Sequence, residues 1–569
     1  MMHESKKSDL AIRAMKPSNK AGSDAAAEMA EQRAGTEGNA IQQSTHRTQM
    51  RTRVSQALER VRQAAKVRKK ERFTALLHHV NPDLLQLSFY ALKRNAAPGV
   101  DGVTWDDYEA DLQSNLQDLH SRVHRGAYRA QPSRRKYIPK PDGRQRPLGI
   151  AALEDKIVQR AVVAVLNAVY EQEFVGFSYG FRPKRSAHDA LDALIVGIKR
   201  KRVNWVLDLD VRDFFGTVSH EWLIRFLEHR IGDQRILRLI RKWLKAGVLE
   251  EGVVTEGEVG TPQGATVSPL LANAYLHYVF DLWAHQWRKR HATGDVIIVR
   301  YADDAVLGFE HEAEARRFLE DLRARFAEFS LSLHPDKTRL IEFGRHAAAN
   351  RERQGLGRPE TFTFLGFTLI SGKSRQGRFL IHRKTRGDRM RATLRRVKDE
   401  LRRRMHWPIP EQGRWLGQVL TGFFAYHAVP TNSRALRAFH CNVMHLWRRS
   451  LSRRSQRGLL PWDRFRKYAA AWLPRPRIKH LWPEQRFDVR HPRWECLNRA
   501  RSDLCGGCAA MRIPTANKSS GVITLRDDLG CVAPGARGAG VDLRAYRMVL
   551  VALVSGCCIQ SLNFFNWIE

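Results

Sequence analysis

Two acidic residues, Asp303 and Asp304, stand side by side between two short apolar runs. Adjacent carboxylates pack poorly and repel each other, and a bound cation relieves that repulsion. Such a pair also occurs in ordinary polar β-turns, so it leaves both interpretations open. A second acidic stretch favours the cation, because Asp208 and Asp210 share one face of an otherwise apolar strand expected over residues 203–211. The alternation does not distinguish which of these two aspartates is a ligand.

Convergent carboxylates of this kind support nucleotidyl transfer with two divalent metals about 3.5–4 Å apart. One metal activates the attacking hydroxyl, and the other stabilises the leaving pyrophosphate. Mg²⁺ prefers oxygen ligands and retains waters, so the protein supplies only a few carboxylates on a rigid platform. We therefore expect two Mg²⁺ ions, with Mn²⁺ as an alternative.

Strands and a basic hairpin are expected to position these groups. Apolar runs at residues 296–299 and 305–309 predict a hairpin whose turn carries the Asp-Asp pair. The stretch Tyr137–Ile150 places two extended pieces around Pro-Asp-Gly, which predicts a second hairpin with basic tips. Apolar residues recur every four positions after Leu153, and Arg-rich helical patterns follow from Lys384 onwards. Without a regular βαβ alternation, the pattern indicates an α+β fold followed by an all-α region.

The charge points to a polyanionic partner. Lys and Arg total 97 against 59 Asp and Glu, a formal net charge of +38, and the excess is dispersed along the chain. Each neutralised phosphate releases counterions, so nucleic acid is the partner that such a chain favours. The apolar run at residues 548–558 is shorter than the roughly 20 residues that span a bilayer, so no membrane is expected. Seven cysteines, mostly near the C-terminus, do not suggest a disulfide framework and favour the cytoplasm.

Residues 51–487 resemble group II intron-encoded reverse transcriptase/maturases of the bacterial type. The Tyr-Ala-Asp-Asp turn resembles the polymerase motif that holds two catalytic acids. The stretch Asp210–Phe215 resembles the preceding motif, whose first aspartate binds metal and whose aromatic residue five positions later screens the ribose 2′-position. The resemblance implies Asp210, Asp303 and Asp304 as catalytic metal ligands, a metal contact from the carbonyl of Val211, and Phe215 as the sugar gate. Asp208 and Asp213 are then bystanders.

Other motifs of the resemblance imply nucleotide contacts. Gly260–Gly264, followed by Ser268–Asn273, resembles the loop and helix that lie against the incoming nucleotide, which implies a contact from Gln263. The basic hairpin resembles a fingertip motif in which Lys140 and Arg146 bind the triphosphate. A point charge and a bidentate fork suit that ligand.

Further residues are expected to contact nucleic acid. Arg182 lies among aromatic residues that could stack on bases or belong to the core. Lys337 lies in a stretch that resembles the family's palm-edge motif. It could contact phosphates, or it could simply lie at a corner between a helix and a strand. Tyr426, Arg453 and Arg454 lie in stretches that resemble maturase motifs holding intron RNA, where a thumb gripping any primer–template duplex is the alternative.

The resemblance implies a right-hand polymerase, with fingers and palm followed by an α-helical thumb. A single CxxC motif near the C-terminus does not indicate the family's endonuclease domain. The expected organisation is a disordered tail over 1–50, a basic helical extension over 51–95, reverse transcriptase fingers and palm over 96–380, a thumb/maturase domain over 381–487, and an unassigned C-terminal extension over 488–569.

The expected function is an RNA-directed DNA polymerase of a group II intron. It would copy intron RNA into DNA from a DNA primer or target with dNTPs during retrohoming, and bind intron RNA to assist splicing. It would be nucleoid-associated when bound to DNA. Two alternatives are an RNA-binding splicing cofactor that needs no polymerase activity and a domesticated, defence-type bacterial reverse transcriptase.

Overall fold

The computed structural model describes residues 36–139, 145–250, 253–255, 260, 264–454 and 460–491. A long helix, α1 (Thr36–Val67), opens this part of the chain, and its Met50, Val54 and Val61 are buried. The disorder expected to residue 50 is therefore wrong from Thr36 onwards. The few apolar residues in the first turns gave no periodic signal, although Met50 reaches the core.

The basic hairpin is present as predicted and belongs to a sheet of order β2-β1-β4-β5. In its antiparallel register Arg146 lies opposite Ile138. β1 continues into the sheet by pairing in parallel with β4. The strands are β1 (Ser133–Pro139), β2 (Gln145–Ile150), β4 (Val248–Glu250) and β5 (Val253–Thr255).

The expected acidic strand and acidic hairpin form one antiparallel sheet of order β6-β7-β3-β8. The hairpin strands are longer than predicted, leaving only Ala302 and Asp303 between them. Helix α12 contacts β3 and β7, while α6 contacts β6. The strands are β3 (Trp205–Leu209), β6 (Val296–Tyr301), β7 (Asp304–Phe309) and β8 (Arg339–Glu342).

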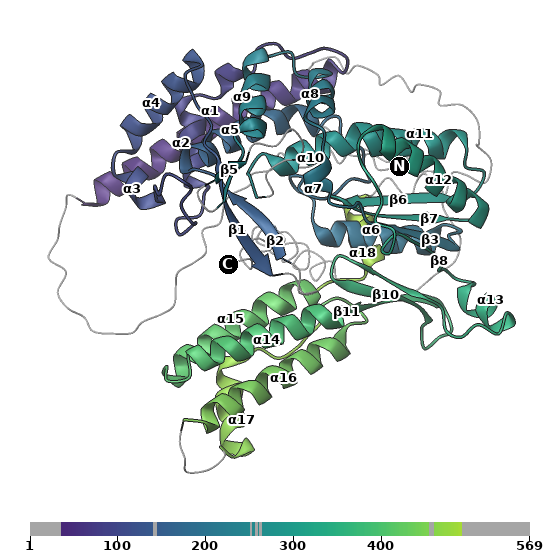
Figure 1. The fold of residues 1–569 in the computed structure, drawn as a ribbon. Helices are drawn as coiled ribbons and strands as arrows, with labels where there is room; N and C mark the ends of the chain where they lie inside the picture. The colour runs from purple at the N-terminus through teal and green to yellow at the C-terminus, as the bar shows by residue number, and fades with distance from the viewer. Residues whose placement is uncertain are drawn as a thin grey trace, which may run out of the picture. The chain divides into compact units, whose positions relative to one another are not determined.

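Helices enclose the first core, and the four-residue repeat after Leu153 is confirmed as α5. Its Ile157, Ala161 and Val165 are fully buried. Helices α1, α2, α4, α5 and α9 gather at one end of this unit, above β1 and β2 in the view of Figure 1. The helices and helical turns are η1 (Leu77–His79), α2 (Pro82–Tyr90), α3 (Trp105–Ala110), α4 (Leu112–Arg125), α5 (Leu153–Tyr170), α6 (Ala187–Arg200), α7 (Phe214–Thr217), α8 (His220–Glu228), α9 (Gln234–Lys245), α10 (Ser268–Leu276), the π-helix η2 (His277–Asp281), α11 (Leu282–Arg290), α12 (Glu312–Glu328) and α13 (Ala347–Arg353).

A third sheet, of order β11-β10-β9, leads into the expected helical region. Helices α14, α15 and α16 lie beside one another (Figure 1), around a core of their own that includes Leu416, Phe439 and Trp447. The elements are β9 (Thr361–Phe364), β10 (Phe367–Lys373), β11 (Phe379–Thr385), α14 (Gly387–Arg403), α15 (Ile409–His427), α16 (Ser433–Ser452), α17 (Trp462–Trp472) and α18 (Pro483–Arg490).

The chain divides into two compact units, Met1–Phe487 and Asp488–Glu569. Of the second unit the structure describes residues 488–491. Among the described helices, none combines the length and the apolar character needed to cross a membrane.

Candidate active site

The acidic residues converge where β3 ends beside the hairpin of β6 and β7. In the antiparallel register Leu209 lies opposite Ala305, the residue after Asp304. Asp210 follows the last residue of β3, and its carbonyl accepts the backbone N–H of His334 at 2.8 Å. The turn aspartates and the aspartate after β3 therefore lie at the same end of the central sheet.

Burial and neighbouring negative charge raise the pKa values of the two hairpin aspartates. Burial, followed by repulsion from Asp303, Asp210 and Asp208, raises the pKa of Asp304 to about 7. Burial and the charge of Asp210 also raise the pKa of Asp303, while the guanidinium of Arg146 opposes that rise. Because the surface of Asp304 is open to solvent, we consider the neighbouring negative charges the larger cause at that residue. A divalent cation relieves the repulsion between neighbouring carboxylates and so allows all of them to be ionised together.

Two groups beside the acids complete this end of the sheet. Lys337 donates from Nζ to Oδ2 of Asp210 at 2.7 Å, and its side chain is half exposed. Val211 forms an isolated antiparallel bridge with Leu333, in which the hydrogen bonds are made by the flanking residues. The carbonyl of Val211 therefore points away from that partner and accepts no hydrogen bond from the described residues.

The donor set fits Mg²⁺, although the described residues contain no group of three metal-binding side chains already drawn together. Asp210, Asp303 and Asp304 offer hard carboxylate oxygens, and Val211 offers a carbonyl oxygen. Mg²⁺ commonly keeps several waters and takes one or two protein carboxylates together with substrate phosphates. An open arrangement with one acid paired to the ammonium of Lys337 is compatible with such an ion.

Asp208, which the sequence left as a bystander, belongs to the same electrostatic group. It faces Arg339 across the β3–β8 pairing. Burial raises its pKa to about 6, with Arg339 opposing and Asp210 adding to the rise. Asp208 therefore contributes negative potential to the carboxylates without lying at the turn.

The segments expected to contact a nucleotide meet beside the acids. Gly260 has a φ of +93°, and a Cβ there would lie 3.0 Å from the carbonyl of Phe215. Gly264 has a φ of +114°, and a Cβ there would lie 2.9 Å from the carbonyl of Gly149, on the strand that carries Arg146. The loop thus begins at the proposed sugar gate and ends at the basic hairpin. The expected contacts Lys140 and Gln263 lie outside the described residues.

Gly216 leaves room for the side chain of Asp213. Asp213 has a φ of +41° just before α7. A Cβ at position 216 would lie 2.3 Å from Oδ2 of Asp213. The carboxylate of Asp213 thus occupies the space of a side chain, which supports its assignment as a bystander to the chemistry.

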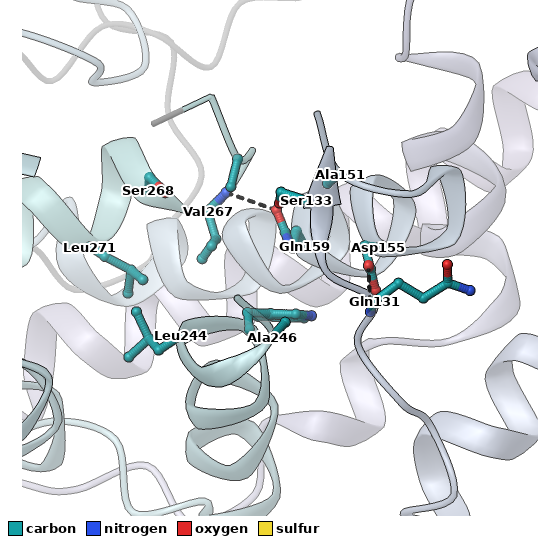
Figure 2. A pocket seen from close by; sticks show the side chains of 12 residues that line it. Gln131, Ser133, Ala151, Asp155, Gln159, Leu244, Ala246, Val267, Ser268 and Leu271 are labelled. Carbon is teal, nitrogen blue, oxygen red and sulfur yellow. Dashed lines mark hydrogen bonds between the residues drawn. The ribbon is translucent and has the colours of Figure 1, made fainter. Parts of the chain in front are cut away.

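A small pocket lies behind the start of α10 and contains none of the predicted site residues. Figure 2 shows Gln159 of α5 reaching across it, with its side-chain oxygen accepting the backbone N–H of Val267 at 3.4 Å. Asp155 lines the same pocket and accepts from the backbone N–H of Gln131 at 3.1 Å and from the hydroxyl of Tyr128. Burial raises the pKa of Asp155 to about 6. These buried polar bonds tie the root of β1 and the end of the nucleotide loop to α5.

Arg182 does not face a nucleic acid, which corrects the prediction. Its side chain is 2% exposed and forms an ion pair with Glu171 at 3.0 Å. It also donates to the carbonyls of Val175 and Ser178 at 2.8 and 2.9 Å. The nearby Tyr179 is buried, so the alternative of a structural cluster holds. Sequence alone could not reveal this, because the partner carboxylate lies on another segment.

The maturase-like residues divide between structural and exposed positions. The hydroxyl of Tyr426 donates to the carbonyl of Leu365 at 2.7 Å, and its ring stacks on Phe367. Arg454 donates to the carbonyl of Trp407. Tyr426 and Arg454 each form a contact within the chain, and their expected role in binding RNA stays a prediction. Arg453 is exposed at the end of α16.

Arg389, in the first turn of α14, was not among the residues predicted from the sequence. Its side chain is exposed and lies over the Leu365–Gly366 turn, with Nη1 3.2 Å from where a Cβ of Gly366 would be. The backbone N–H of Arg386 bonds to the carbonyl of Gly366 at 3.1 Å and fixes the turn. The charge of Arg389 lowers the pKa of Asp304, against the larger effects that raise it. Arg389 therefore places a cation beside the Leu365–Gly366 turn and near Asp304.

Known proteins match this part of the chain. The family model for reverse transcriptase (RNA-dependent DNA polymerase) matches residues 138–369. Protein YkfC of Escherichia coli (strain K12) is 34% identical over 313 residues, which cover 49% of this chain and 77% of YkfC. Group II intron-encoded protein LtrA of Lactococcus lactis subsp. cremoris is 36% identical over 224 residues, which cover 39% of this chain and 37% of LtrA. Nuclear intron maturase 3, mitochondrial, of Arabidopsis thaliana is 30% identical over 125 residues, covering 22% of this chain and 17% of that protein.

The carboxylate hairpin and the sheet that holds it lie within the matched residues, so the class is that of proteins with a reverse transcriptase domain. The chain belongs to the family of group II intron-encoded reverse transcriptases and maturases.

Proposed function

We propose that the protein is an RNA-directed DNA polymerase of a group II intron, which copies intron RNA into DNA during retrohoming and binds that RNA to assist splicing. The observation that carries the proposal is the convergence of Asp210, Asp303 and Asp304 at one end of the central sheet, with pKa values raised at the hairpin. Carboxylates that repel one another at the surface of a fold have few uses other than binding cations.

The proposed architecture is a right hand. The sheet β6-β7-β3-β8 serves as palm and the β1–β2 hairpin as fingertips, within residues 96–380. Residues 381–487 serve as thumb and maturase domain, because α14 to α17 form a separate helical core directly after the third sheet. The preceding residues 51–95 form a basic extension.

In the proposed mechanism the three aspartates and the Val211 carbonyl hold two Mg²⁺ ions, or Mn²⁺ in their place. When bound, the ions activate the primer 3′-hydroxyl and stabilise the leaving pyrophosphate. Arg146, with Lys140 and Gln263, seats the triphosphate of the dNTP, and the ring of Phe215 occupies the space of a ribose 2′-hydroxyl. Lys337 neutralises Asp210 in this structure, and the same carboxylate would hold a metal when that pair is released.

Binding of intron RNA is proposed for the exposed basic surface of the helical region, including Arg453. Structured RNA is recognised mainly through its shape and backbone phosphates. Exposed arginines on α14 and α16 suit that mode, and Arg454 beside them is proposed to contribute, whereas Arg182 and Tyr426 support the fold that presents them.

The test is primer extension on an RNA template with Mg²⁺ and dNTPs. Wild type and Asp463→Ala, which removes a fully exposed carboxylate of α17, should both extend the primer. Asp303→Ala should lose at least about 1,000-fold in rate, because a metal ligand is removed. A folded wild type that binds intron RNA without extending any primer would contradict the polymerase and favour the splicing-cofactor alternative.

A further inference from the structure

Arg300, two residues before the acidic turn, is one of the most deeply buried charges in the described chain, with 1% of its surface exposed. A guanidinium has five N–H donors, and all five are used here. Nε and Nη2 bind the two carboxylate oxygens of Asp281 at 2.7 and 2.6 Å. The others donate to Asn273 Oδ1 at 3.1 Å, the Ala302 carbonyl at 2.8 Å and Ser178 Oγ at 2.7 Å.

These partners come from two parts of the chain: the continuous helical run of α10 and η2, and the segment that precedes α6. Asn273 lies on α10, Ser178 precedes α6, and Asp281 ends the π-helix η2. A single π-helical turn within an α-helix often marks a functional position, because it shifts the side chains that follow. His277 of the same turn has its pKa lowered to about 4, mainly by burial, so it is neutral and leaves Asp281 to Arg300.

The bond to Ala302 connects this network to the acidic turn. Ala302 has a φ of +57°, a conformation that favours glycine in a two-residue hairpin turn. The opposite side of the turn is closed as well, since a Cβ on Gly180 would lie 2.2 Å from the Ala302 nitrogen. Asn273 Nδ2 donates to the Gly180 carbonyl at 2.8 Å. Asn273, which accepts a hydrogen bond from Arg300, therefore also holds the Gly180 backbone against the turn. Backbone of unfavourable conformation persists only where its surroundings impose it.

We propose that Arg300 is a positioning residue: with Asp281, Asn273 and Ser178 it fixes the turn that presents Asp303 and Asp304 to the metal ions. The proposal deepens the polymerase function and rests on it. An ordinary core ion pair would stabilise the fold without bonding to the turn. Here one donor is committed to the carbonyl of the residue directly before Asp303.

The geometry gives a sharp expectation for substitution by lysine. Lysine keeps the charge but offers three donors on a single atom, so it cannot satisfy the carboxylate, the amide and the turn carbonyl in one plane. A turn released by about 1 Å is enough to reduce a rate roughly 100-fold. Arg230→Lys is the matched control, because Arg230 is 3% exposed, is paired with Glu173 at 3.0 Å and lies on another part of the fold.

The experiment compares wild type, Arg300→Lys, Asn273→Ser and Arg230→Lys. Melting is followed by circular dichroism, Mn²⁺ affinity by electron paramagnetic resonance of the free ion, and single-turnover extension by gel. We expect both lysine variants to lose similar thermal stability. Arg300→Lys should bind Mn²⁺ at least about fivefold more weakly and extend about 100-fold more slowly, whereas Arg230→Lys should match wild type in both. Asn273→Ser should shift both readouts in the same direction by less.

Wild-type Mn²⁺ affinity in folded Arg300→Lys, or equal losses of Mn²⁺ affinity and extension rate in Arg300→Lys and Arg230→Lys, would overturn the proposal. If Arg300→Lys does not fold, Asn273→Ser decides by the same criterion. Because Mn²⁺ binding is read without nucleic acid, a wild type that binds Mn²⁺ but never extends a primer contradicts the polymerase, while the metal readout still decides the role of Arg300.

Discussion

Two clusters of buried charge in this protein are built differently. The hairpin cluster consists of Arg300, Asp281, Asn273, Ser178 and the Ala302 carbonyl, and its guanidinium has every donor satisfied. The joint cluster consists of Asp192, Arg383, Arg486, His188 and His480. It connects α6 to β11 and to the start of α18. In it one carboxylate serves two arginines, with N–O distances of 2.6 Å to Arg486 and 3.7 Å to Arg383.

The joint cluster is also incompletely hydrogen-bonded. Neither ring nitrogen of His188 has a hydrogen-bond partner within the described residues. A fully satisfied polar network fixes one geometry, whereas a partly satisfied one leaves alternatives of similar free energy. We therefore expect the carboxylate hairpin to be rigid. We expect the joint cluster, between α6, β11 and the start of α18, to open more readily by local fluctuation.

The strongest test of that contrast removes the carboxylate of the hairpin cluster. Asp281→Ala would leave Arg300 buried and unpaired, which should lower the free energy of unfolding by about 4 kcal/mol. Urea denaturation followed by circular dichroism measures this loss. A loss below about 1 kcal/mol would contradict the view that this pair fixes the hairpin.

Removing the charge of the joint cluster should have a smaller and more local effect. Asp192→Asn keeps one acceptor for Arg486, so a loss of about 2 kcal/mol is expected. Hydrogen exchange should increase in α6 and in residues 480–487, with β6 and β7 unchanged. The Mn²⁺ affinity of the carboxylates should also remain at the wild-type value. Faster exchange in β6 and β7 would show that the two clusters are not independent.

The acidic turn could be predicted from the sequence, but the Arg300 network that holds the turn could not. Aspartates are conspicuous on strands that are otherwise apolar, which is why Asp210, Asp303 and Asp304 could be predicted. Strand β3, the β6–β7 hairpin and helix α5 were all confirmed. Arg300 carried no such signal, since an arginine in a strand is ordinarily a solvated side chain. Its partner Asp281 lies 19 positions earlier, within a π-helical turn that no periodicity indicates.

The nucleic-acid contacts were harder to predict for the same reason. Arg182 was predicted from its aromatic neighbours, yet its guanidinium turns inward to Glu171. Basic residues near aromatic residues are common in a chain of this charge, and only packing separates an exposed cation from a buried one. Arg389 was missed because its helix carries many arginines, and its position over the Leu365–Gly366 turn depends on how α14 meets the third sheet.

Mild acid should weaken the joint cluster. The Nε2 of His480 donates to the Ala425 carbonyl at 2.7 Å and its Nδ1 accepts from Arg486 at 2.8 Å, so protonation would break the second bond. Burial is the main cause that lowers the pKa of His480 to about 4 and of His427 to about 3. Both histidines bind protons more readily in the unfolded chain. Their protonation therefore lowers the free energy of unfolding as pH falls below about 6.5. The charged or titratable groups around them are His188, Asp192, Arg383, Arg389, Lys479 and Arg486.

Asp192 works in the opposite direction. Burial raises its pKa to about 6, so it adds stability as pH falls below that value. For His480, His427 and Asp192 alone, the expected loss between pH 7 and pH 5 is about 2 kcal/mol, measured as a falling melting temperature. His480→Gln should flatten the decline, whereas His406→Gln, at an exposed position, should leave it unchanged. An undiminished decline in His480→Gln would assign the acid sensitivity elsewhere.

The smallest effect is expected outside both clusters, at Arg389. This side chain forms no hydrogen bond or ion pair within the described residues and lies over the Leu365–Gly366 turn beside Asp304. If it contacts a backbone phosphate of the primer, Arg389→Ala should raise the KM for primer–template about fivefold, because one charge-assisted bond is lost. The rate at saturation should change little, since the carboxylate hairpin is held by Arg300. Arg316→Ala, at an exposed position on α12, is the control and should leave KM unchanged. A fall in saturated rate with KM unchanged would instead mean that Arg389 acts on the carboxylates, and that the hairpin depends on the helical region after all.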